Sequence, residues 1–165
     1  MQLNSSRSEM ASEAPKPSKD LRLVLQKGTF KSILDSLGKD IPAQLARLTG
    51  EGTKLSADKI RFVNGEISEI IGLKFDKAKD ELIQDTEIKP SDSPEEVRVK
   101  SRAADEATNF IGELTTFIIE KIAAIIDAVW KTVVEIGRKI ASFFTDLWRW
   151  IMAYKDDDQG KPELY

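Results

Sequence analysis

The side chains that could do chemistry in this chain are limited to carboxylates, amines and hydroxyls. The 165 residues include no cysteine and no histidine, which removes thiolate and imidazole nucleophiles, disulfides, and the usual ligands of zinc and haem. The segment Gly50–Lys54 has the composition of a phosphate-binding loop, but its glycines and lysine do not have P-loop spacing. We therefore expect no enzymatic activity, no cofactor and no metal site.

Charged residues with helical spacing form an ordered polar pattern near the carboxyl end. Asp127, Lys131, Glu135 and Lys139 follow one another at intervals of four residues, so on one helix each pair would contribute about 0.2–0.5 kcal/mol. Such a charge ladder is typical of a solvated helix face. A second interpretation is that the ladder lines a water-filled pore or pairs with a neighbouring protomer, because charges inside a membrane must face water or each other.

The element that would position this ladder is a long amphipathic helix. From about residue 106 to 154 the apolar residues keep the helical period for roughly thirteen turns, with the charged residues gathered on the opposite side. We predict one very long helix over residues 97–154. The apolar residues predicted to form its membrane- or partner-binding face are Ile111, Ile118, Ile122, Ile126, Val129, Val133, Ile136, Ile140, Phe143, Phe144, Leu147 and Ile151.

Aromatic residues lie along the borders of this apolar face. Trp130 and Trp148 fall at one border, Trp150 falls at the other, and Tyr154 lies near the end of the helix. Indole and phenol rings favour such borders at a membrane interface, and they equally cover the edge of a protein core. Small residues that would let a second helix approach closely are Gly112, Ala123, Gly137 and Ala141.

The rest of the chain is organised around a linker. The expected parts are a disordered N-terminal tail at 1–19, a small mostly helical domain at 20–85, the linker at 86–96 with Pro90 and Pro94, and an acidic disordered tail at 155–165. Ser93 is also predicted to cap a helix that starts at Pro94.

The sequence of the N-terminal domain leaves the secondary structure of two segments open. A helix from Phe30 is expected to end at Gly38, with a second short helix after Pro42. Residues 59–71 are ambiguous, because Asn64-Gly65 is a strong hairpin signal while the flanking apolar residues keep helical spacing. We favour a helix here, preceded by Ser56 as its cap. The predicted fold is therefore mainly α, with an α+β N-terminal region containing one hairpin as the alternative.

The charge and the hydropathy of the chain indicate which kinds of partner it can bind. The net charge is −3, and no clustered basic surface is visible, so we expect no nucleic-acid binding. The N-terminus lacks the apolar core of a secretory signal, and no run of eighteen uncharged apolar residues exists. We expect a cytoplasmic protein that associates peripherally with membranes.

The apolar face of the predicted long helix is too large for the rest of the chain to cover. The helix would be about 70 Å long, and burying its large apolar side chains would release tens of kcal/mol. We therefore expect a partner, either a lipid membrane or partner helices that include further copies of this chain.

Two functions fit this expectation. The first is a non-enzymatic membrane-active protein whose long helix binds or inserts into a bilayer and self-associates as a pore or a membrane-shaping assembly. The alternative is a soluble structural subunit whose long helix is buried in a homo- or hetero-oligomeric helical assembly.

Overall fold

The computed structural model describes residues 14–50, 55–128 and 132–153. Within these ranges the chain forms five helices and no strand: α2 (Lys19–Lys27), α3 (Phe30–Thr49), α4 (Ala57–Asp85), α5 (Pro94–Ala128) and α6 (Val133–Met152). The prediction of a mainly α protein is confirmed. Residues 59–71 lie within α4, so the alternative of a hairpin there is wrong.

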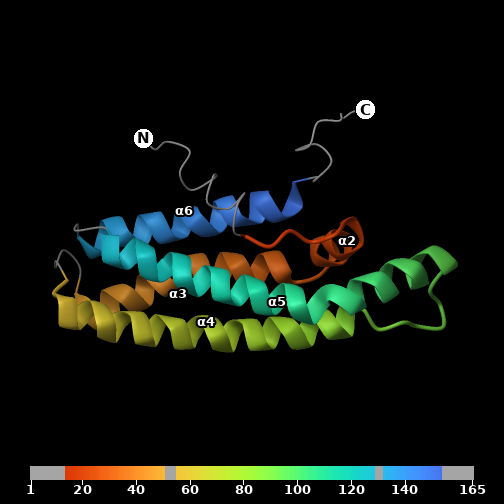
Figure 1. The fold of residues 1–165 in the computed structure, drawn as a ribbon, viewed down its shortest axis with the longest axis horizontal. Coiled ribbons are helices and arrows are strands. Elements are labelled where there is room, and N and C mark those ends of the chain that lie inside the picture. The colour runs from red at the N-terminus through yellow and green to blue at the C-terminus, as the bar shows by residue number, and fades with distance from the viewer. Residues whose placement is uncertain (1–13, 51–54, 129–131, 154–165) are drawn as a thin grey trace.

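The four longer helices form an antiparallel bundle (Figure 1). α3 and α5 run in one direction, and α4 and α6 run in the other, as in an up-down-up-down bundle. α3 contacts α6 most extensively and α4 contacts α5 next, whereas the contacts of α3 with α4 and of α5 with α6 are sparser. The short helix α2 lies at one end of the bundle, mainly against α5.

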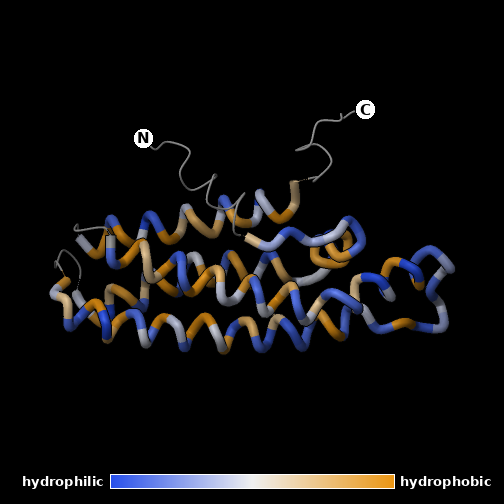
Figure 2. Tube along the Cα trace, viewed as in Figure 1, coloured by the Kyte–Doolittle hydropathy of each residue, from blue (hydrophilic) through white to orange (hydrophobic). Residues whose placement is uncertain are grey.

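One hydrophobic core runs through the bundle. Apolar and polar residues alternate along each long helix (Figure 2), and the apolar stripes face inward. Every helix contributes a fully buried side chain, for example Leu21, Leu34, Ile67, Leu114 and Ile140. The segments on either side of the predicted linker therefore share one core.

Aromatic rings meet where α2 joins α3. The ring of Phe30 lies 6.2 Å from that of Phe75 on α4, 6.4 Å from that of Phe110 on α5, and 6.4 Å from that of Trp148 on α6. A single side chain on α3 thus contacts the other three long helices. This cluster joins the four long helices near the end of the bundle that carries α2.

Helix α3 continues through Gly38 and Pro42, where the sequence predicts one helix to end and another to begin. Proline at position 42 removes the N–H that would bond to the carbonyl of Gly38. The buried stripe of α3 nevertheless runs without interruption across both residues. A Cβ built on Gly38 would lie 3.6 Å from the Cβ of Phe144, so packing against α6 outweighs the local stop signals.

The predicted starts of α4 and α5 are confirmed. The hydroxyl of Ser56 accepts a hydrogen bond from the amide of Lys59 at 3.2 Å. The hydroxyl of Ser93 accepts from the amide of Glu96 at 3.1 Å, and the Glu96 carboxylate accepts from the amide of Ser93 at 2.7 Å. This reciprocal pair is a capping box, and it places the first turn of α5 at Pro94.

The helix predicted over residues 97–154 is two helices rather than one. α5 ends at Ala128, and α6 begins after the N-cap residue Thr132. The hydroxyl of Thr132 accepts from the amide of Glu135 at 3.4 Å, and the Glu135 carboxylate accepts from the amide of Thr132 at 3.3 Å. The apolar period crosses the break because both helices face the same core, which explains why the sequence suggested a single rod.

Candidate binding surfaces

The apolar face predicted to bind a membrane or a partner is buried inside the bundle. Each of its described residues is at most 7% exposed: Ile111, Ile118, Ile122, Ile126, Val133, Ile136, Ile140, Phe143, Phe144, Leu147 and Ile151. Val129 lies outside the described residues. The expectation that the chain could not cover this face is wrong, because α6 runs antiparallel to α5 and packs mainly against α3, while α4 covers most of α5.

Small residues let α6 approach α3 closely. A Cβ built on Gly137 would lie 3.1 Å from the Cβ of Pro42, and Ala141 lies 4.0 Å from the Cβ position of Gly38. These two predicted small residues, Gly137 and Ala141, therefore face a second helix of the same chain. At Gly112 a built Cβ meets no atom within 4 Å, so this third position faces open space.

The two described tryptophans of the predicted border cover the edge of the core. Trp148 is half-buried beside Phe30. Trp150 is half-buried as well, and its indole Nε1 is the one buried side-chain polar atom in the described part of the chain that has no hydrogen-bond partner. Trp130 and Tyr154 lie outside the described residues.

The predicted charge ladder does not form on one helix. Asp127 is exposed in the last turn of α5, whereas the Glu135 carboxylate caps the start of α6 and Lys139 is exposed further along it. Lys131 lies outside the described residues. Because the two helices are separate, the spacing of four residues does not hold these charges in one row.

The N-terminal segment ties α5 and α6 to the end of the bundle. We call residues 14–27, which comprise a short extended stretch and α2, the N-terminal clasp. The carboxylate of the nearly buried Asp20 lies 3.3 Å from the guanidinium of Arg98 and 3.4 Å from that of Arg102, both on α5. The amide of Ser18 donates to the carboxylate of Glu106 at 3.1 Å. The clasp is thus anchored on α5.

The same clasp holds the carboxyl end of α6. The Nζ of Lys16 donates to the carbonyl of Trp150 at 2.6 Å and lies 4.0 Å from the centre of its indole ring. Arg22 donates from Nη1 to the carbonyl of Ala153 at 3.2 Å. Cations are favourable at this position, because the last carbonyls of a helix lack partners and carry partial negative charge.

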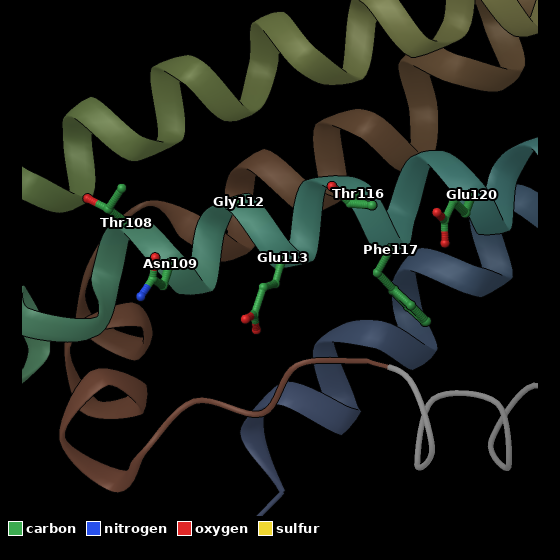
Figure 3. Close-up of a pocket in the computed structure, with 7 residues that line it drawn as sticks. All are labelled: Thr108, Asn109, Gly112, Glu113, Thr116, Phe117 and Glu120. Carbon is green, nitrogen blue, oxygen red and sulfur yellow. The ribbon is translucent and has the colours of Figure 1, made fainter.

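Two of the hollows on the described surface are large enough to hold a ligand. A wide groove of about 750 Å³ follows α5, and Figure 3 shows its lining side chains along that one helix: Thr108, Asn109, Gly112, Glu113, Thr116, Phe117 and Glu120. A smaller hollow of about 360 Å³ lies between α2, the end of α4 and the start of α5, with Val24, Asp85 and Val99 in its lining. Desolvation, and then the nearby charge of Glu81, raise the pKa of Asp85, although Lys89 acts in the opposite direction.

Three large apolar side chains are exposed on a surface that the sequence did not single out. Phe62, Leu73 and Ile83 on α4 are 51%, 64% and 50% exposed. They fall outside the stripe of α4 residues that points into the core, such as Val63 and Ile67. That mismatch with the helical period was the signal in the sequence that could have identified them.

Neither hollow has the ligands of a metal centre. In the described ranges no group of three carboxylates is placed to hold a metal ion, and none of the described helices has the length and apolar content of a membrane span. Comparison with protein families, curated proteins and solved structures gives no match to this chain.

Proposed function

We propose that this non-enzymatic protein binds lipid surfaces by opening its bundle into two helix pairs, α3 with α6 and α4 with α5. The observation that carries the proposal is the uneven packing. Contacts within each pair are more extensive than the contacts of α3 with α4 or of α5 with α6. Separation of the two pairs therefore breaks fewer contacts between helices than release of α6 alone.

The chain connections favour the same mode of opening. α3 ends at Thr49 and α4 begins at Ala57, while α5 ends at Ala128 and α6 begins at Val133. All four of these helix ends lie at one end of the bundle (Figure 1). The pairs can therefore separate at the opposite end, where the N-terminal clasp lies, while the chain stays connected at the first.

The energetics make the opening depend on lipid. Exposing each large apolar side chain to water costs about 1.5–3 kcal/mol, so the open form is scarcely populated in water. At a bilayer the same side chains enter the boundary between headgroups and acyl chains, which offsets that cost. Lipid then shifts the equilibrium because it interacts with the open form alone.

Helix α6 is suited to lie at such a boundary. Its buried face includes Phe143, Phe144 and Ile151, while Arg138 and Lys139 are exposed on the opposite face. The capping box at its start uses only residues of α6 and its N-cap, so the helix does not need its neighbours to begin there. Acids are also present on the polar face, so we expect lipid binding to depend only weakly on anionic headgroups.

Disulfide locks provide the test, because the chain has no cysteine of its own. In the double variant Gly28→Cys with Asp85→Cys, a Cβ at position 28 lies 3.4 Å from the Cγ of Asp85, near where the second sulfur would sit. This lock joins residue 28, which lies between α2 and α3, to the last residue of α4. In flotation with phosphatidylcholine vesicles, we expect the reduced form to float and the oxidised form to stay in solution.

A second lock is the matched control. Pro42→Cys with Gly137→Cys joins α3 to α6 within one pair, where the Cβ positions are 3.1 Å apart, a few tenths of an ångström closer than a relaxed disulfide. We expect the oxidised form of this variant to float. Its failure to float would mean that α6 leaves α3, which contradicts opening by pairs. Failure of the unlocked protein to float at both low and high salt would refute lipid binding itself.

The second candidate function is a soluble subunit of a helical assembly. Its support is the exposed apolar surface of α4, which needs no opening of the bundle. A mass above 18.5 kDa per particle in a native mass measurement without lipid would favour it. The self-association that we propose for the membrane-active form is expected only when vesicles are present.

A further inference from the structure

Helix α4 carries a surface that none of the other described helices covers. Phe62 and Leu73 are eleven residues apart, so they lie on nearly the same line along the helix. Ile83 continues this surface toward the end of α4, and all three side chains are at least half exposed. We call the exposed surface from Phe62 to Ile83 the outer α4 face. Its length is about 30 Å.

Two glycines lie on the same face. Gly65 and Gly72 are seven residues apart, and a Cβ built on either meets no atom within 4 Å. Glycine inside a helix costs about 0.5–1 kcal/mol relative to alanine, and packing within the bundle requires neither residue. Glycine does allow the backbone of a second helix to approach closely. The glycines therefore fit a partner that lies along the helix.

The charges of this face select the partner. Glu69, Asp76 and Asp80 are exposed in the same third of the helix surface, about 120° wide, and that third contains no lysine or arginine. Bases lie just outside this third on both sides: Lys59, Arg61, Lys77 and Lys79. The Nζ of Lys59 is 5.7 Å from the ring centre of Phe62. Like charges repel, so this face disfavours an anionic lipid surface and the same face of a second copy.

We propose that the outer α4 face binds a cationic amphipathic helix of another protein. Apolar side chains of that helix would contact Phe62, Leu73 and Ile83, and its lysines or arginines would pair with the acids, as in helix-in-groove recognition. A partner helix of about 20 residues matches the length of the face. The face lies outside the core, so it is available in the closed bundle, and the inference stands independently of lipid binding.

The glycines also provide the readout. A synthetic amphipathic peptide of about 20 leucine and lysine residues is titrated into isotopically labelled protein without lipid, at about 0.15 M salt. We expect the amide resonances of Gly65 and Gly72 to shift while that of Gly112, which is equally open but lies on α5, stays in place. Equal shifts at Gly112, or equal binding of a leucine and glutamate peptide of the same pattern, would overturn the proposal.

Substitutions test the apolar part of the contact. We expect Phe62→Ser with Leu73→Ser to weaken binding of the leucine and lysine peptide at least about tenfold, as for loss of an interface hot spot. Val134→Ser is the matched control, because Val134 is 41% exposed on α6. An unchanged affinity in the double variant would refute the proposal, as would concentration-dependent self-association that the double variant abolishes.

Discussion

At the scale of single residues, Gly137 sets the distance between α3 and α6. A side chain there would press on Pro42, whose Cβ is 3.1 Å from the built Cβ. We expect Gly137→Leu to lower the free energy of unfolding by about 1–3 kcal/mol, as overpacking does. Gly112→Leu, on an open part of α5, is expected to be neutral or to stabilise by up to about 1 kcal/mol. Urea unfolding compares the two, and equal stabilities would contradict the close approach.

The carboxyl of Asp85 is expected to make the stability of the fold depend on pH. Desolvation first, and then Glu81, raise the pKa of its carboxyl. The folded state therefore binds the proton more readily than the unfolded chain, so the charged carboxylate destabilises the fold above its folded pKa, and this penalty disappears as the pH falls below the unfolded value. We expect Asp85→Asn to stabilise at about pH 7 by a few tenths of a kcal/mol, because solvent screens the carboxyl, and to have no effect at about pH 3.

The matched control for this effect is Asp105→Asn, which changes an exposed acid on α5. Its unfolding free energy, measured in urea across the same pH range, should differ from the parent by a constant amount. A gain from Asp85→Asn that persisted unchanged in acid would show that charge is not its cause.

At the scale of elements, the start of α6 depends on Thr132. Thr132→Ala removes the hydroxyl that accepts from the amide of Glu135. We expect this change to lower the free energy of unfolding by about 1 kcal/mol. Hydrogen exchange should show faster exchange in the first turn of α6. Thr116→Ala, at an exposed position within α5, should leave the free energy of unfolding and the exchange rate in α6 nearly unchanged. Slow exchange in the Thr132 variant would mean that packing alone fixes the start of this helix.

Local signals predicted some helix boundaries and failed at others. The starts of α4 and α5 could be predicted because Ser56 and Ser93 act through neighbouring residues only. The capping box of Thr132 and Glu135 was equally present in the sequence, but the continuous apolar period obscured it. At Gly38 the reverse occurred, since contacts with a distant helix overrode a strong stop signal.

At the scale of the whole molecule, the N-terminal clasp links α5 to the carboxyl end of α6, and in our proposal it keeps the two helix pairs together. Asp20→Ala removes the carboxylate that pairs with Arg98 and Arg102. We expect faster hydrogen exchange in α2 and in the last turn of α6, together with flotation at lower lipid concentration. Glu113→Ala, which removes an exposed acid on α5 away from the clasp contacts, is the control. Faster exchange without a change in flotation would separate the clasp from lipid binding.

Membership of the apolar face could be predicted from the sequence, but its burial could not. Ile118, Ile136 and Ile140 all point to the apolar side, as the helical period indicates. Whether such a face is covered depends on where the chain turns back, and that turn lies between α5 and α6. Exposed residues of α4, such as Leu73, were missed because they were counted among the apolar residues that form the core of the N-terminal domain.

The contacts of Lys16 and Arg22 bring residues near both limits of the described chain together. Since Arg22 bonds to the carbonyl of Ala153, a short covalent bridge could join residue 153 to residue 14. New termini could then be opened at the exposed residues 90 and 91, between α4 and α5. Such a circular permutant would keep all the described helices, and a covalent link would then hold the clasp to the end of α6 in addition to the polar contacts.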